Sequence, residues 1–266
     1  MFRENLLPYW WMLYRHSKIL NQRTDIFRNV EDAFTAKHAD LCLQPKHVYL
    51  DIGSGSSLVP TFLYRRHQPW TYATELDQAH LDPQRNFMKT LHFTNDDRFF
   101  VQAEDATQLS FKDESVNFIT AISTIEHIPG NGDTLAMGEF ARVLAPGGRL
   151  IVTVPASPSY GENESTSYYA GFERRYDPAA LQSRLGREDL RLIDQLHMVS
   201  APEEFIEQFN RSFDETFHGE PWNVAWYKNA WHDQYPDVSI LLTLGFVRLS
   251  TDPNGSFGAC LAFEKK

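Results

Sequence analysis

The chain has 266 residues, of which 42% are apolar and 23% are charged, and these values argue against a disordered or fibrous protein. Its 35 acidic residues outnumber 25 lysines and arginines, which gives a formal charge of −10 and disfavours nucleic acid as a partner. The length predicts one elaborated domain.

The first 45 residues are predicted to form a helical cap. Apolar residues recur there at helical spacing. They are Ile26, Val30, Ala33, Phe34 and Leu41, preceded by a weaker series at Leu6, Trp10, Leu13, Ser17 and Leu20.

Nothing in the chain predicts export or a membrane span. The N-terminus has no apolar stretch followed by a cleavage site, and the run Val238–Leu249 is shorter than the roughly 18 residues that a spanning helix needs. Cys42 and Cys260 fit no metal or redox spacing. We therefore expect a cytoplasmic protein with reduced thiols.

Short apolar runs separated by helix-length segments begin at His47. Runs of this kind are typical of parallel strands buried on both faces, so residues 46–266 are predicted to form an α/β domain. The runs are HVYLDIG, WTYATEL, RFFVQAE, VNFITAIS and GGRLIVTVP.

The pattern becomes less regular after Pro155. Asp177 followed by Pro178 is typical of a helix start. We predict strands at Leu190–Val199 and Phe257–Phe263, a helix at Pro202–Phe217, and an aromatic-rich insertion at about 200–250.

The stretch YLDIGSGSSLVP predicts a strand, a tight turn and a helix. Gly53 and Gly55 let the backbone approach a ligand, and the following helix presents free amides. Leu58 stands where a dinucleotide fingerprint has its third glycine, and Asp51 would repel a pyrophosphate. The loop therefore favours a positively charged ligand without phosphate, although a structural turn without a ligand is an alternative.

Two further strand ends carry acids. Glu75 lies 20 residues beyond Gly55, where an acid accepts hydrogen bonds from ribose hydroxyls. A solvated acid at the end of a strand is the alternative for Glu75. Asp105 can accept a hydrogen bond from an adenine amine, and Ala106 offers a backbone amide to the ring. Together these residues favour an adenosine ligand.

In order and spacing, DIGSGS, ATELD, AEDATQLSFKDESVNFI, STIEHI and VLAPGGRLIVTVP resemble the class I S-adenosylmethionine-dependent methyltransferases, particularly their broad small-molecule group. The resemblance implies a Rossmann-like, mostly parallel sheet of seven strands with an antiparallel last strand and helices on both faces. It implies that S-adenosyl-L-methionine is held by Asp51, Gly53, Ser54 and Gly55 at its methionine part, Glu75 at the ribose, Asp105 and Ala106 at the adenine, and Ser123 and Thr124 beside the sulfonium.

Glu126 and His127 are the candidate catalytic residues. A histidine can take a proton from the acceptor near neutral pH. Methyl transfer depends chiefly on alignment of the acceptor with the methyl group, so a base is optional. The alternative is that Glu126 and His127 only shape the pocket. Related enzymes of quinone pathways have a metal-binding acid three residues before the glutamate. Ser123 occupies that position here, so we expect no metal.

Candidate residues for the acceptor lie in aromatic and basic stretches. Trp10 and Trp11 in the cap, and Trp222 and Trp226 in the insertion, either line an apolar pocket or fill the core. Arg174 and Arg175 either meet an acceptor carboxylate or phosphate, or form a surface cluster of salt bridges.

The function predicted is methyl transfer to an oxygen, nitrogen or carbon atom of a small, aromatic or lipid-like metabolite. Leu58 and the motifs AEDATQL and LAPGG argue against a rival prediction, an NAD(P)-dependent oxidoreductase. A second rival is a regulatory subunit that binds S-adenosylmethionine without catalysis.

Overall fold

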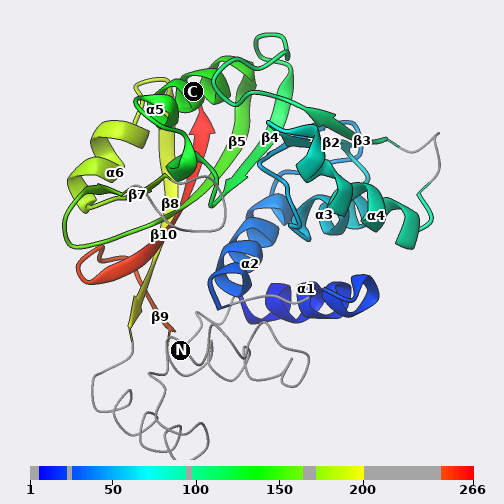
Figure 1. Cartoon of the computed structure of the whole chain (residues 1–266), viewed down its shortest axis with the longest axis horizontal. Coiled ribbons are helices and arrows are strands. Elements are labelled where there is room, and N and C mark those ends of the chain that lie inside the picture. The colour runs from blue at the N-terminus through cyan, green and yellow to red at the C-terminus, as the bar shows by residue number, and fades with distance from the viewer. Residues whose placement is uncertain (1–5, 23–25, 94–97, 164–171, 201–246) are drawn as a thin grey trace, which may run out of the picture.

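The computed structural model describes residues 6–22, 26–93, 98–163, 172–200 and 247–266. Helices α1, Leu7–Leu20, and α2, Ile26–Asp40, precede the first strand (Figure 1). The predicted boundary at residue 45 falls between α2 and that strand. The weaker series of apolar residues proves to be the buried face of α1, whereas Leu41 lies beyond α2 and is exposed.

Strands and helices then alternate as predicted. The elements are β1 (Val48–Ile52), α3 (Val59–His67), β2 (Trp70–Glu75), the 3-10 turn η1 (Gln78–Leu81), α4 (Asp82–Thr90), β3 (Phe99–Ala103), β4 (Val116–Ile122), the 3-10 turn η2 (Ile125–His127), α5 (Gly132–Val143) and β5 (Leu144–Pro155).

The C-terminal part adds β6 (Gly161–Asn163), β7 (Glu173–Arg175), α6 (Pro178–Leu185), β8 (Leu190–Ser200), β9 (Val247–Ser250) and β10 (Ser256–Lys265). The predicted start of α6 is confirmed, since the Asp177 carboxylate accepts a hydrogen bond from the amide of Ala180 and Pro178 occupies the first turn. The predicted helix at 202–217 and the insertion at about 200–250 lie outside the described residues, apart from β9 at the insertion's end.

One mostly parallel sheet organises the molecule, in the order β3-β2-β1-β4-β5-β10-β8-β9. The reversed last strand is confirmed, because β10 runs antiparallel to both β5 and β8. Among the residues that the structure describes, the sheet has eight strands, where seven were predicted. Strand β9 pairs with β8 at the edge, in a region whose sequence showed no strand pattern. Strands β6 and β7 form a separate two-stranded ribbon.

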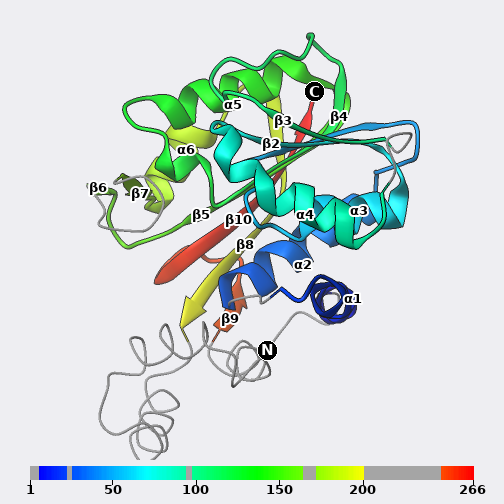
Figure 2. The same cartoon turned by 45° about the vertical axis from the view of Figure 1, so that its right-hand side comes forward.

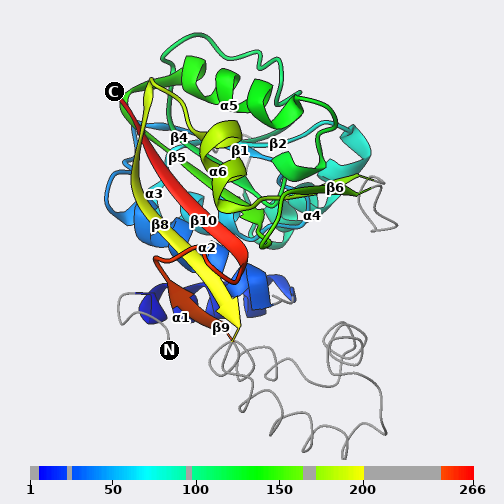
Figure 3. The same ribbon diagram turned by 90° about the vertical axis from the view of Figure 1, so that its left-hand side faces the viewer.

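Helices cover both faces of the sheet (Figures 2 and 3). Because side chains alternate along a strand, Leu50 and Ile52 pack with α5 and α6, whereas Tyr49 packs with α1, α2 and α3. Lys37 of α2 also forms an ion pair with Asp194 of β8 at 2.8 Å. The N-terminal helices therefore share the core of the sheet.

None of the described helices is both long and apolar enough to cross a membrane.

Candidate active site

The strand order locates the site at the junction of β1 and β4. The chain runs from β1 outward to β2 and β3, and then returns to the other side of β1 at β4. In open α/β sheets, ligands bind in the crevice outside the carboxyl ends of the strands where the order reverses. This rule places the expected ligand site, called the crevice below, between the loop after β1 and the segment from Ser123 to His127 after β4.

The glycine loop after β1 contacts the segment after β4. Gly53 has φ of +68°, and a Cβ atom built there would lie 2.4 Å from the side chain of Thr124. The Thr124 hydroxyl donates to the backbone carbonyl of Ile52 at 3.1 Å. The close approach at Gly53 is therefore made by Thr124, which joins the two borders of the crevice.

Asp51 is buried at the end of β1, with 2% of its surface exposed. The register pairs it with Thr120 of β4. Its carboxylate accepts hydrogen bonds from the hydroxyls of Thr120, Ser54 at 2.6 Å and Tyr49 at 3.2 Å. Burial raises the pKa of Asp51 and these three hydrogen bonds lower it; burial is the larger effect, and the resulting pKa is about 6. The acid is thus fixed between two strands, with Ser54 of the loop bonded to it.

Glu75 at the end of β2 holds the loop from a second side. Its Oε1 accepts a hydrogen bond from the amide of Gly55 at 2.8 Å, and burial raises its pKa. The fully buried Gln84 of α4 donates its side-chain amide to the carbonyls of Ser57 at 2.8 Å and Gly55 at 3.2 Å. Sequence reasoning missed Gln84, because a single glutamine in a polar helix carries no signal of its inward orientation.

Asp105 and Ala106 follow β3 at the same edge of the sheet. The Asp105 carboxylate accepts from the amide and the hydroxyl of Thr107, at 2.8 and 2.7 Å. The Asp105 side chain is exposed, whereas Ala106 is buried, with 8% of its surface exposed. Their adenine-binding role stays a prediction.

Ser123 connects the crevice to the N-terminal helices. It has φ of +46°, its amide donates to the carbonyl of Thr153 at 3.0 Å, and its hydroxyl donates to Glu31 Oε1 at 2.9 Å. Glu31 belongs to α2, is 2% exposed, and forms an ion pair with Arg28 at 2.9 Å. The sequence predicted a helical cap but gave no sign that Glu31 of this cap accepts a hydrogen bond from Ser123, directly after β4.

The catalytic candidates lie in η2. His127 Nδ1 is 2.9 Å from the carbonyl of Phe172. Because a carbonyl only accepts, Nδ1 carries the proton, and the lone pair of Nε2 is left to act as a base. Nε2 lies 3.8 Å from Glu126 Oε1. The geometry is consistent with the predicted base, and no contact with an acceptor tests it.

Glu126 is fully buried beside other acids. Its pKa is raised to about 8, chiefly by burial; the charges of Glu31 and Glu173 also raise the pKa, whereas a hydrogen bond from its own backbone and the charge of Arg28 lower it. Its Oε2 has no hydrogen-bond partner among the described residues.

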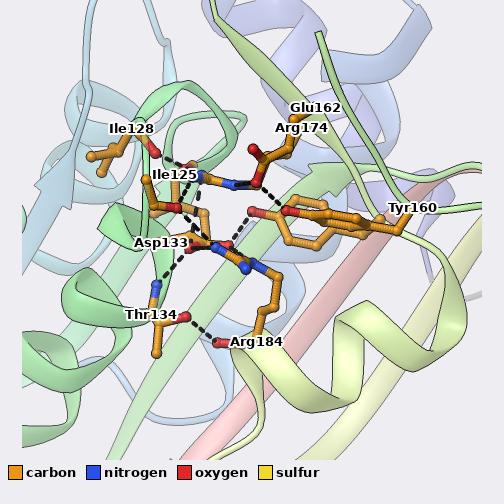
Figure 4. Close-up of polar contacts among 10 residues, drawn as sticks. Ile125, Ile128, Asp133, Thr134, Tyr160, Glu162, Arg174 and Arg184 are labelled. Carbon is orange, nitrogen blue, oxygen red and sulfur yellow. Dashed lines mark hydrogen bonds and ion pairs between the residues drawn. The ribbon is translucent and has the colours of Figure 1, made fainter.

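The structure corrects the acceptor role predicted for Arg174 (Figure 4). This side chain is completely buried and donates to the carbonyls of Ile128 at 2.6 Å and Gly130 at 2.5 Å. It also contacts Glu162 at 3.2 Å and Asp133 at 3.7 Å. All these partners belong to the protein, so Arg174 fixes the turn after η2. Arg175 is exposed and pairs with Glu173 at 3.1 Å, as the salt-bridge alternative expected.

The tryptophans predicted to contact the acceptor lie in different environments. Trp10 is 7% exposed and fills the core beneath α1, which fits the alternative weighed for it. Trp11, the next residue of that helix, is 52% exposed, and its ring centroid lies 6.1 Å from that of Trp10. Trp222 and Trp226 lie outside the described residues. In the part of the chain that is described, no group of three or more histidine, cysteine or acidic side chains is arranged to hold a metal ion.

The sheet order, the reversed β10 and the glycine loop define the class I methyltransferase fold. Residues 50–152 match the family model described as "Methyltransferase domain". This segment is therefore similar to known methyltransferase domains, and the fold is that of the class I S-adenosylmethionine-dependent methyltransferases.

One curated relative is Methyltransferase GfsG of Streptomyces halstedii, 28% identical over 126 residues. The match covers 47% of this chain and 44% of GfsG, so the chain spans less than half the length of that relative.

Two solved structures share the fold. One is geranyl diphosphate C-methyltransferase from Streptomyces coelicolor A3(2), in complex with Mg²⁺, geranyl diphosphate and S-adenosyl-L-homocysteine. It matches with a TM-score of 0.55 at 14% identity, and the match covers 90% of this chain and 81% of that protein. The other is the cyclase SpnF, which matches with a TM-score of 0.56 at 19% identity, over 89% of this chain and 82% of SpnF. At these identities the likeness is one of fold.

Proposed function

We propose that this chain transfers a methyl group from S-adenosyl-L-methionine to an oxygen, nitrogen or carbon atom of a small-molecule acceptor. One observation carries the proposal. Asp51, the Gly53–Gly55 loop and Glu75 border one side of a single crevice, and Ser123 to His127 border the other. The methyltransferase-domain match over residues 50–152 supports the same reaction.

The side chains at the crevice fit a positively charged donor. Asp51, Glu75 and Glu126 are acidic, and carboxylates in a partly buried crevice attract a cation. Asp51, Ser54 and the loop glycines would hold the methionine part, Glu75 the ribose, Asp105 with Ala106 the adenine, and Ser123 with Thr124 the sulfonium. The donor supplies an electrophilic methyl group on a positively charged sulfur.

The chain's own residues then align the acceptor and accept its proton. The Thr124 contact with Gly53 and the hydrogen bond from Ser123 to Glu31 hold both borders in place, and such positioning is the main contribution to a displacement reaction. His127 Nε2 is the base with a free lone pair, so we assign proton acceptance to that atom.

Calorimetry with S-adenosylmethionine, S-adenosylhomocysteine and NAD tests the proposed donor. We expect the first two to bind and NAD not to bind. Glu75→Gln should weaken donor binding by about tenfold through its loss of charge, whereas the exposed Glu188→Gln should leave it unchanged. Binding of NAD alone would contradict the proposal.

Turnover requires a separate assay, because fold does not imply function and one neighbour of this fold is named a cyclase. Formation of S-adenosylhomocysteine should be measured against fractionated metabolite pools. Donor binding without turnover in any pool would favour the regulatory-subunit alternative.

A further inference from the structure

Helix α1 exposes large apolar and cationic side chains. Its buried side packs on the core through Trp10 and Leu13. The three large apolar side chains on its exposed side are each about half exposed, from 46% for Leu7 to 52% for Trp11. No acidic residue occurs in this helix. Its exposed residues, called the α1 surface below, are Leu7, Pro8, Trp11, Arg15, Lys18 and Ile19.

The spacing of these residues gathers them on one side of the helix. Leu7, Trp11 and Arg15 follow one another at intervals of four residues, and Lys18 comes three residues later. Such intervals bring side chains together along a helix. Helix α1 lies on the side of the molecule away from α5 and α6 (Figures 1 and 3). Grouped apolar side chains on a protein surface indicate an interaction site, so the α1 surface is a candidate for docking.

A pocket of about 390 Å³ lies beside this surface, between α1 and α3. Arg15 and Ile19 of the α1 surface line it, together with Phe62, Arg65 and Arg66 of α3. None of these residues was assigned to the crevice. The pocket therefore extends the α1 surface with further cationic and apolar groups.

The arginines of the pocket differ in their partners. Arg66 donates two hydrogen bonds of 2.6 Å to the Asp40 carboxylate, which balances its charge. Arg65 Nη1 lies 3.3 Å from His16 Nδ1 and must be the donor, because a guanidinium group cannot accept. Neither Arg15 nor Arg65 forms an ion pair among the described residues. Two cations of the pocket are thus available to an anion.

A buried histidine fixes Arg65. His16 is 4% exposed, and since its Nδ1 accepts from Arg65, its Nε2 carries the proton and donates to Thr61 Oγ1 at 2.9 Å. The Thr61 hydroxyl donates in turn to the carbonyl of Leu58 at 3.1 Å. Burial and the charge of Arg65 lower the pKa of His16 to about 4. The guanidinium group is therefore held by a neutral partner, with its charge intact.

This combination of groups selects the class of partner. The chain carries a formal charge of −10, but charges more than about 8 Å away are largely screened at physiological salt, so the local cations decide. A free anion would need the arginines and not the exposed apolar side chains. An anionic bilayer offers phosphates to the arginines and an apolar region to Trp11, and tryptophan is enriched at membrane interfaces.

We propose that α1 docks in the plane of an anionic lipid bilayer. Leu7, Trp11 and Ile19 enter the boundary between headgroups and acyl chains, and Arg15 and Arg65 hold lipid phosphate at the pocket. The long stems of the arginines allow their charged ends to stay at the level of the phosphates. The α1 surface lies outside the crevice, so this inference does not depend on the proposed function.

Flotation with lipid vesicles tests the docking of the full chain. The vesicles contain phosphatidylcholine alone, or an equal mixture of phosphatidylcholine and phosphatidylglycerol. We expect binding to the mixed vesicles to be at least about tenfold tighter than binding to phosphatidylcholine. Binding should also weaken as salt is added, because the attraction to the anionic surface is screened.

Substitutions separate the two contributions. The double variant Arg15→Gln with Arg65→Gln should weaken binding about 25-fold, since each cation near an anionic surface contributes about fivefold. Trp11→Ser should weaken binding about tenfold through its lost apolar contact. The exposed Lys112→Gln with Arg175→Gln removes the same charge from other elements and should leave binding unchanged.

Leu135→Ser is the apolar control, because this side chain of α5 is 58% exposed on the far side of the sheet. It should leave binding unchanged. If circular dichroism shows that Trp11→Ser does not fold, Ile19→Ser takes its place.

Four results would overturn the inference. The first two are absence of binding to the mixed vesicles and equal binding to both vesicle types. The third is binding that survives both the arginine double variant and Trp11→Ser. The fourth is binding of soluble polyglutamate or inorganic phosphate without binding of vesicles, which would assign the surface to an acidic protein or to a free anion.

Discussion

Replacement of Arg174 by methionine tests whether this buried side chain fixes the turn after η2. Methionine keeps an unbranched apolar stem and removes the guanidinium group. The carbonyl of Ile128 then loses its donor from Arg174, whereas Gly130 and Asp133 still accept from Arg184, at 3.1 and 2.7 Å. The partly buried carbonyl of Ile128 is therefore left without that partner.

The magnitude follows from this inventory. An unsatisfied buried carbonyl costs about 1–3 kcal/mol, and the lost charge-assisted bonds add to that cost, while release from burying a charge offsets part of it. We expect Arg174→Met to lower the free energy of unfolding by about 2–4 kcal/mol, and the melting temperature by roughly 5–12 °C.

Urea unfolding followed by circular dichroism measures this loss. Arg175→Met is the matched control, because the neighbouring arginine has 57% of its side chain exposed and, within the part of the chain that is described, its ion pair is with Glu173. We expect Arg175→Met to change the free energy of unfolding by less than about 0.5 kcal/mol. If the two variants are equally stable, Arg174 does not have the structural role assigned to it.

Three other substitutions probe the crevice. In Gly53→Ala the added methyl group meets the Thr124 side chain, and we expect the free energy of unfolding in urea to fall by about 2–4 kcal/mol. Gly147 has φ of +75° and open space around it, so Gly147→Ala should lower this free energy by about 1 kcal/mol. Equal losses in the two variants would refute the contact between Gly53 and Thr124. Glu126 has a pKa raised from 4.5 to about 8, so the folded state binds more protons and stability should fall as pH rises across this interval. Urea midpoints at about pH 5, 7 and 9 should fall more steeply in the wild type than in Glu126→Gln, because Asp51, whose pKa is also raised, contributes equally to both proteins; equal slopes would assign the pH dependence to groups other than Glu126. Gln84→Met removes the donor to the loop carbonyls and should weaken S-adenosylhomocysteine binding in calorimetry by about tenfold, whereas the exposed Gln182→Met should not.

The sequence by itself determined the layered fold and the residues along the carboxyl edge of the sheet. Strand and helix periodicities are local, so the runs from Val48 to Pro155 predicted five parallel strands and their helices. Turn and cap chemistry is also local, which explains why the glycine loop and the start of α6 at Asp177 could be predicted.

Only the tertiary structure decided which side chains complete the site and which only support it. The bond from Ser123 to Glu31 joins residues 92 apart, and Arg174 reaches Ile128 across 46 residues. Whether a charged side chain faces a ligand or a backbone carbonyl depends on packing between distant elements. Local composition does not encode that packing, so two adjacent arginines with the same sequence signal occupy opposite environments.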